Sequence, residues 1–181
     1  MIFLLVAVLV TAWFIGKYNY FIRQNEAITS QWAQVENQLQ RRFDLIPNLE
    51  GATKGITKQE KEVFGALADA RTRYAGSTTI DEKASAAGQV ESSLARLLVI
   101  AENYPVLQSS QSFQNLMVEL EGTENRIAVE RMKYNDLVKE LNAGVKTFPS
   151  SVVASIFHVA ERNYFEVPKE AQAVPKVDFT K

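Results

Sequence analysis

The sequence predicts an all-α protein, in which an N-terminal transmembrane helix continues into a long antiparallel bundle of about four helices connected up and down. Three observations predict this class. The chain opens with an apolar run without charges. Long stretches with apolar residues at steps of three and four follow, as on amphipathic helices. Pro47, the loop AGSTT at 75–79 and Pro105 separate these stretches, and no strand-like alternation of comparable length competes.

Residues 1–22 form the predicted membrane anchor. Residues 1–16 carry no charged side chain, and a helix needs about 20 apolar residues to cross a hydrocarbon core. The alternative is a cleaved signal peptide, which is disfavoured because a basic leading region is missing and the apolar run continues past the small residues Val10 and Ala12. Aromatic residues gather where the run ends, as they do at membrane interfaces: Trp13, Phe14, Tyr18, Tyr20 and Phe21.

The basic residues beside the anchor predict its orientation. Lys17 and Arg23 follow the apolar run, and no Lys or Arg precedes it. Positively charged flanks stay in the cytoplasm, so the N-terminus is expected outside and the C-terminal domain in the cytoplasm.

The first helix is expected to continue from the membrane as a stalk. Its apolar positions start at Ile28 and continue to Phe43, so a helix over 2–43 would measure about 60 Å. Pro47 favours a turn after it, with Asp44 as the N-cap of the second helix, because the residue before proline avoids α geometry. The alternative is a kink within one helix.

Three further long helices and a short one are expected. The second carries apolar positions from Leu49 to Tyr74, and the third runs from about Asp81 to Tyr104. The fourth is expected from a Ser109 or Ser110 cap to Phe148. Every step between its core positions is three or four: Phe113, Met117, Leu120, Glu124, Ile127, Arg131, Tyr134, Val138, Leu141, Val145 and Phe148.

The domain organisation predicted from these elements has three parts: an anchor over 1–22, a bundle with a short C-terminal amphipathic helix over 23–157, and a mostly extended tail over 158–181. Ser150 or Ser151 is expected to cap the short helix. In an up-down bundle the fourth helix returns to the bilayer, which predicts membrane or partner contact for this helix. Packing across the end of the bundle is the alternative. The residues concerned are Val152, Val153, Ile156 and Phe157.

Composition excludes several classes of function. The chain has no Cys, one His, 20 Lys+Arg and 21 Asp+Glu. Disulfide scaffolds, thiolate metal sites and cysteine nucleophiles are excluded, and net charge gives no case for nucleic acid. There is no glycine-rich phosphate loop or nucleophile elbow, and the His158 and Glu161 pair has a spacing common by chance. We therefore expect no enzyme activity and no cofactor or metal.

Two charged residues interrupt the apolar face of the fourth helix. Glu124 and Arg131 need partners if buried, and with Arg42 they form a predicted buried polar network. The favoured interpretation is that these charges fix helix register. The alternative is a pocket for a ligand or a proton. Other candidate partners are Arg41, Asp44, Glu60 and Glu91.

Several stretches resemble the LemA family. They are YNYFIRQNEAITSQWAQVENQLQRRFDLIPNLEGATKG at 18–55, FQNLMVELEGTENRIAVERMKYNDLVKELN at 113–142, and VPKVDF at 174–179. The resemblance implies a bacterial protein of the cytoplasmic (inner) membrane with one N-terminal span, an outward N-terminus and a helical domain. It supplies no reaction and no catalytic residues. A relative in magnetotactic bacteria is linked to building magnetosome membranes, which suggests membrane organisation.

The function predicted is a single-pass scaffold or interaction protein that contacts the lipid bilayer and either forms a homo-oligomer or organises membrane partners. The first alternative is an accessory subunit of a membrane enzyme such as a quality-control protease, with the tail at 174–181 as docking strand. The second alternative is an enzyme or ligand binder that uses Glu124 and Arg131.

Overall fold

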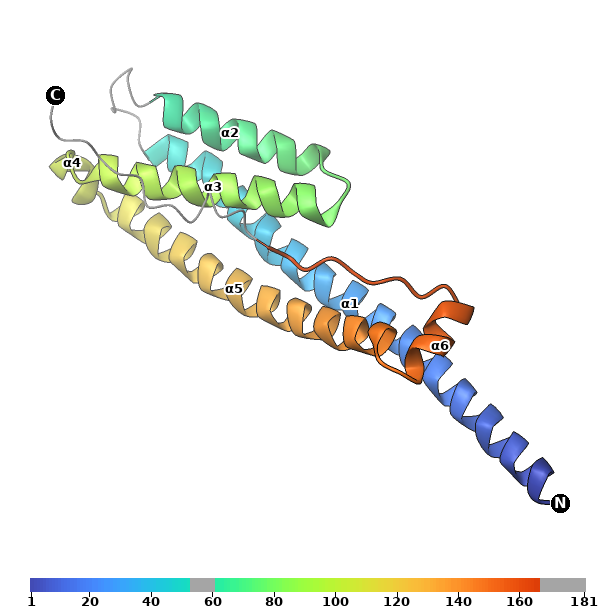
Figure 1. Ribbon diagram of the computed structural model, residues 1–181. Helices are drawn as coiled ribbons and strands as arrows, with labels where there is room; N and C mark the ends of the chain where they lie inside the picture. Colours follow the sequence, from blue (N-terminus) through green and yellow to red (C-terminus); the bar gives the residue numbers. More distant parts are fainter. Residues whose placement is uncertain (53–60, 167–181) are drawn as a thin grey trace, which may run out of the picture. The chain divides into compact units, whose positions relative to one another are not determined.

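The computed structural model describes residues 1–52 and 61–166, and within them the chain is helical with no strand (Figure 1). The predicted all-α class is confirmed. The helices are α1 (Ile2–Ala52), α2 (Lys61–Gly76), α3 (Ile80–Ala101), α4 (Pro105–Gln108), α5 (Gln111–Lys146) and α6 (Ser150–Ile156).

The chain divides into two compact units. The anchor unit comprises Met1–Glu36 and Val129–Tyr164, and the bundle unit comprises Asn37–Ala128 and resumes at Phe165. Both α1 and α5 contribute residues to each unit, because each helix continues through the division. The predicted limits of anchor, bundle and tail remain predictions.

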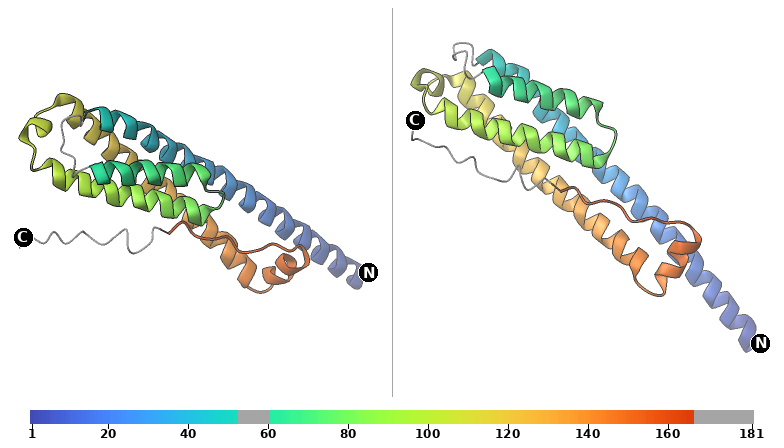
Figure 2. Two further views of the ribbon diagram at one scale, coloured as in Figure 1. Left: turned by 90° about the horizontal axis from the view of Figure 1, so that it is seen from above. Right: turned by 45° about the horizontal axis from the view of Figure 1, so that its top comes forward.

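In the anchor unit, α1 and α5 lie side by side and antiparallel (Figures 1 and 2). Gln24 Nε2 donates to Glu140 Oε2 at 2.7 Å, and Gln31 Nε2 donates to Glu130 Oε2 at 2.6 Å. As residue numbers rise along α1 they fall along α5, which is the antiparallel arrangement. The buried core beneath these bonds comprises Phe21, Ile28, Val35, Tyr134, Val138, Leu141, Val153 and Ala154.

The bundle unit contains the end of α1, α2, α3, α4 and the start of α5. Helices α2 and α3 lie side by side, joined by a short loop that ends in the N-cap Thr79 (Figure 2). The rings of Phe43 and Tyr74 meet at 4.4 Å between centroids. The larger buried side chains of this unit include Leu39, Phe43, Ile46, Leu49, Leu67, Val90, Leu97, Phe113, Leu120 and Ile127.

The turn expected at Pro47 was wrong. Helix α1 continues through Pro47 to Ala52, so the single-helix alternative holds, and Asp44 is inside the helix rather than its N-cap. A proline inside a helix costs about 3 kcal/mol, chiefly through a lost hydrogen bond and a steric clash. The ring of Pro47 is on the exposed side of α1, so it displaces no core side chain. Its neighbours Ile46 and Leu49 are buried, and their burial offsets this cost.

The ends of the other helices also differ from the expectation. Helix α3 ends at Ala101, and α4 follows where only a break at Pro105 was expected. Helix α5 ends at Lys146, so Phe148 is 84% exposed instead of in the core. The N-cap of α6 is Pro149, so neither Ser150 nor Ser151 caps this helix. The Ser150 hydroxyl instead donates to Gly144 O at 2.7 Å and to Thr147 O at 2.9 Å.

Candidate functional site

The first turns of α1 form an apolar surface without partners in the described structure. The side chains of residues 1–13 are all exposed, and burial starts only where α5 is reached, at Phe21. Among the described residues, α1 is the one helix long and apolar enough to cross a membrane. The ammonium group of Lys17 lies over the ring of Tyr20, 5.4 Å from its centroid. The first charge after the apolar run therefore lies against one ring of the aromatic belt, which comprises Trp13, Phe14, Tyr18, Tyr20 and Phe21.

Helix α6 packs one face and exposes the other, close to this belt. Val153 and Ala154 are buried, at 0% and 1% exposure, while Val152 and Ile156 stay exposed at 43% and 55%. The ring of Phe157, which is 45% exposed, lies 4.5 Å from the ring of Tyr18 on α1. Of the four residues predicted to contact membrane or partner, the structure therefore places Val153 inside and the other three outside.

A strap over residues 157–164, which begins with a turn and continues without regular secondary structure, fastens α6 to α5. Asn142 holds the strap through both polar atoms of its side-chain amide. Its Nδ2 donates to Arg162 O, and its Oδ1 accepts from Arg162 N, both at 2.9 Å. The Tyr134 hydroxyl donates to Asn163 O at 3.0 Å. Lys146 Nζ lies 2.6 Å from Glu161 Oε2, and this hydrogen bond and charge raise the pKa of Lys146. No local pattern in the sequence marks Asn142 as the residue that holds the strap.

One carboxylate in the hydrogen bonds between α1 and α5, that of Glu130, has a lowered pKa. Glu130 accepts from Lys133 Nζ at 2.9 Å and from Gln31 Nε2 at 2.6 Å. These two hydrogen bonds, that of Lys133 first, hold the pKa of Glu130 below its ordinary value. Glu130 therefore stays ionised at neutral pH and acts as a positioned acceptor between the helices rather than as a proton donor.

The predicted polar network is divided between the units. Arg42 on α1 is 7% exposed, and its Nη1 donates to Glu124 Oε2 on α5 in an ion pair within the bundle unit. Arg131 belongs to the anchor unit and is half-buried there. Arg42 Nε and Gln38 Oε1 are buried and have no hydrogen-bond partner in the described part of the chain. Among the other candidates, Arg41 and Asp44 are exposed, Glu91 is half-buried and has a partner, and Glu60 lies outside the described residues.

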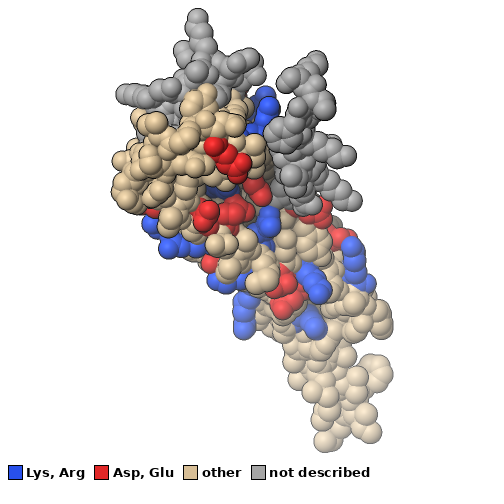
Figure 3. Space-filling view, turned by 90° about the vertical axis from the view of Figure 1, so that its left-hand side faces the viewer, with Lys and Arg blue, Asp and Glu red and all other residues tan. Residues whose placement is uncertain are grey.

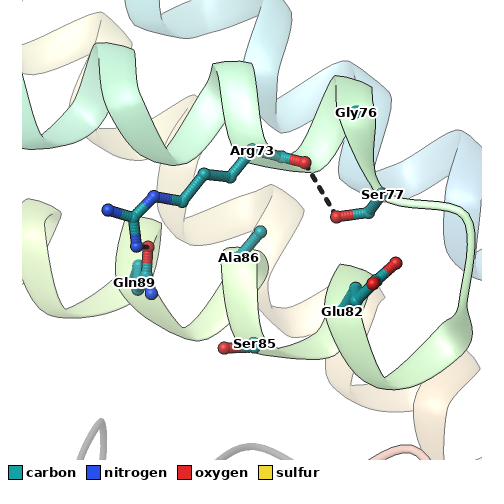
Figure 4. Close-up of a pocket in the computed structure, with 7 residues that line it drawn as sticks. All are labelled: Arg73, Gly76, Ser77, Glu82, Ser85, Ala86 and Gln89. Atoms are coloured by element: carbon teal, nitrogen blue, oxygen red, sulfur yellow. Dashed lines mark hydrogen bonds between the residues drawn. The ribbon is translucent and has the colours of Figure 1, made fainter.

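A shallow hollow of about 440 Å³ opens between α2 and α3 (Figure 4). The side chain of Arg73 points across it and donates to Gln89 Oε1 at 3.2 Å, and the Ser77 hydroxyl donates to Arg73 O at 2.7 Å. Glu82 at its edge belongs to a capping box with Thr79. The side chains of Arg73, Ser77 and Glu82 thus make bonds within α2, α3 and the loop that joins them.

The capping box gives a prediction on stability and its pH dependence. Replacing Thr79 by Ala should lower the free energy of unfolding by about 1 kcal/mol, the usual effect of losing such an N-cap. The backbone N–H groups of Thr78 and Thr79 donate to Glu82, and these bonds lower its pKa. Since the pKa is lower in the folded state, the stabilisation exists above the unfolded-state pKa and disappears as pH falls through the folded-state pKa.

Thermal unfolding of wild type and Glu82→Gln, followed by circular dichroism across acidic pH, checks this expectation. The wild type should have the higher midpoint at neutral pH, and the gap should close as the solution is acidified. A gap of constant size at all pH values would contradict a role for the Glu82 charge.

No cluster in the described residues resembles a metal centre. Within 1–52 and 61–166 there is no group of three or more His, Asp or Glu placed to hold a metal ion. His158 has a φ of 52° and lies in the turn at the start of the strap, and Glu161, three residues later, pairs with Lys146. On the face drawn in Figure 3, basic and acidic side chains of the described residues are interspersed, without a broad area of one sign. The tail at 174–181 lies outside the described residues.

Comparison with known proteins extends these observations. The model of the LemA family matches residues 31–179. The chain belongs to the LemA family. The match includes most of α1 after the apolar run, the bundle unit, α5, α6 and the strap, which together make up the described helical domain.

Relatives of this LemA-family protein occur in magnetotactic bacteria. The magnetosome proteins MamQ 1 and MamQ 2 of Paramagnetospirillum magneticum are each 26% identical over 176 residues, which covers 83% of this chain and 65% of the relative. Magnetosome protein MamQ of Magnetospirillum gryphiswaldense is 25% identical over 175 residues, covering 82% and 64%. The chain thus spans just under two thirds of the length of these curated relatives. With the apolar helix, the family shows a membrane-associated helical protein.

Proposed function

We propose that this LemA-family protein is a single-pass scaffold of the bacterial cytoplasmic membrane, which associates with further copies of itself or organises membrane partners, without catalysing a reaction. The observation that carries the proposal is α1, whose exposed apolar start runs without a break into a helical domain. An apolar anchor that is continuous with a helical domain would tether that domain to the membrane. The kinship with magnetosome proteins supports a role in membrane organisation.

The charges beside the span support an orientation for this scaffold. Lys17 and Arg23 follow the apolar run, so the N-terminus would face outward and the helical domain would lie in the cytoplasm. In this arrangement residues 1–22 are the anchor, and residues 23–157 form the domain. The polar groups described between the helices support positioning rather than chemistry, because Glu130, Glu82 and Glu124 each already hold a neighbouring side chain or backbone group.

The experiment that tests the proposal is the mass of the particle extracted with its native lipids. The chain has a mass of 20.3 kDa, so self-association predicts protein masses at multiples of this value. Protein mass beyond such multiples would identify a bound partner and support the organising role. A particle that contains one chain and no other protein would contradict the scaffold.

A further inference from the structure

Four exposed apolar side chains gather where α5 turns into α6 and the strap. Phe148 is 84% exposed, Val152 43%, Ile156 55% and Phe157 45%. Phe148, Val152 and Ile156 are spaced four residues apart in the sequence. We call these four residues the α6 corner. An amphipathic helix at a water-facing surface carries polar residues on its outer side, so this outer side is adapted to something other than water.

The contact between the α6 corner and α1 indicates what covers the corner. The ring of Phe157 lies 4.5 Å from that of Tyr18, which follows Lys17 directly. Tyr18 belongs to the aromatic belt that ends the apolar run, and such belts lie at the headgroup level of a bilayer. A side chain in ring contact with Tyr18 is therefore at the same level. The apolar surface of the span and the α6 corner adjoin each other through this contact.

The α6 corner is held at this level by bonds within the anchor unit. The Ser150 hydroxyl donates to Gly144 O at 2.7 Å, and Val153, on the inner side of α6, is fully buried. After α6 in the chain, two hydrogen bonds from the Asn142 side chain to the backbone of Arg162 hold the strap; we call this pair of bonds the Asn142 clamp. The helix therefore cannot turn its exposed side away from the membrane without breaking these bonds and exposing its buried face.

We propose that the α6 corner inserts its four apolar side chains into the interface of the bilayer that α1 crosses. Burial of these side chains among lipid glycerol and acyl groups removes their apolar surface from water. The end of the domain would then be seated on the membrane at a second point, which restricts swinging about α1. The inference rests on the membrane span of the proposed function and is independent of self-association.

Fluorescent labels in the full chain test the proposal. The chain has no Cys, so one introduced thiol can carry an environment-sensitive nitrobenzoxadiazole label in vesicles of phosphatidylethanolamine and phosphatidylglycerol. The test position is Ile156→Cys. The matched control is Met132→Cys, also an exposed apolar residue of the anchor unit, at 59% exposure but on α5. The reference for the span is Ala7→Cys, and circular dichroism checks that each variant is folded.

Brominated lipids report which labels reach the bilayer. At Ile156 we expect blue-shifted emission and quenching at least about twofold stronger than at Met132, as for a side chain in the interface. Equal, weak quenching at Ile156 and Met132 with strong quenching at Ala7 would overturn the inference and leave the span intact. Weak quenching at Ala7 would instead overturn the span. Blue-shifted emission at Ile156 without quenching would show a second copy of the chain as the cover, and would also overturn the inference. Val152→Cys replaces Ile156→Cys if that variant does not fold.

Discussion

Replacing Glu124 by Leu should lower the free energy of unfolding by about 3 kcal/mol, because a buried guanidinium would lose its carboxylate. Arg42 is 7% exposed and donates from Nη1 to Glu124 across α1 and α5. Its Nε already has no partner in the described part of the chain. Without Glu124, a second part of the same buried cation would lack an acceptor. The side chain of Glu124 is 33% exposed, so water can partly replace it, which places the expected loss at the lower end for buried pairs.

The double variant Arg42→Met with Glu124→Leu should recover most of this loss. Buried ion pairs replaced by apolar side chains of similar size are often as stable as before, since the desolvation of both charges is avoided. Urea unfolding of the full chain in detergent micelles, followed by circular dichroism, gives the double-mutant cycle. Glu121→Leu, at an exposed carboxylate of α5, is the control and should change stability by less than about 0.5 kcal/mol.

The cycle also tests whether the stranded Arg42 cation is the cause of the loss. A double variant as stable as the wild type supports charges that specify helix register without adding stability. A double variant as unstable as Glu124→Leu would contradict the stranded cation as the cause.

Periodicity predicted the long helices well because burial decides them. The apolar steps of three and four on α5 correctly placed Phe113, Leu120, Ile127 and Tyr134 in the core. The same spacing placed Glu124 in the row that faces the other helices, and Arg42 on α1 was among the candidate partners. A pattern of this kind is repeated over many turns, so a local error at one residue does not change it.

The errors occur where local rules compete with tertiary packing. Pro47 signals a break, but buried Ile46 and Leu49 on either side keep α1 continuous. Phe148 fits the apolar period of α5, yet the helix ends two residues earlier, at Lys146, and the side chain is exposed.

The strap and its clamp had no signal in the sequence. An asparagine beside an apolar row is as consistent with a surface position as with a buried one, and the partner of Asn142 is a backbone group 20 residues away. The α6 corner was identified in part. Its helical pattern was clear, but which side of α6 faces inward depends on the turn that precedes the helix.

A leucine at Gly144 should destabilise the anchor unit by about 2 kcal/mol through overpacking. A Cβ at this position would lie 3.2 Å from Phe21 Cε1 and 3.5 Å from Tyr20 Cε1. Phe21 is completely buried, so its ring has no free space into which it can move. The backbone of α5 therefore approaches α1 closely at Gly144, beside Tyr20 and Phe21 at the end of the membrane anchor.

Gly122 provides the matched control on the same helix. A Cβ at Gly122 would meet no atom within 4 Å, so Gly122→Leu should raise stability by about 0.8 kcal/mol through helix propensity alone. Gly144→Leu has the same propensity gain, and the difference between the two variants isolates the contact with Phe21. Thermal unfolding in micelles measures both midpoints, and equal stabilisation of the two variants would contradict the close approach.

Amide hydrogen exchange of the same variants locates the effect in the chain. Gly144 also supplies the carbonyl that accepts from Ser150, so displacing α5 from Phe21 pulls on the bond that seats α6. We therefore expect faster exchange in α6 and in the strap of Gly144→Leu than in the wild type. The exchange of α3, in the bundle unit, should stay unchanged. Acceleration confined to α5 would show that the close approach and the seating of α6 are independent.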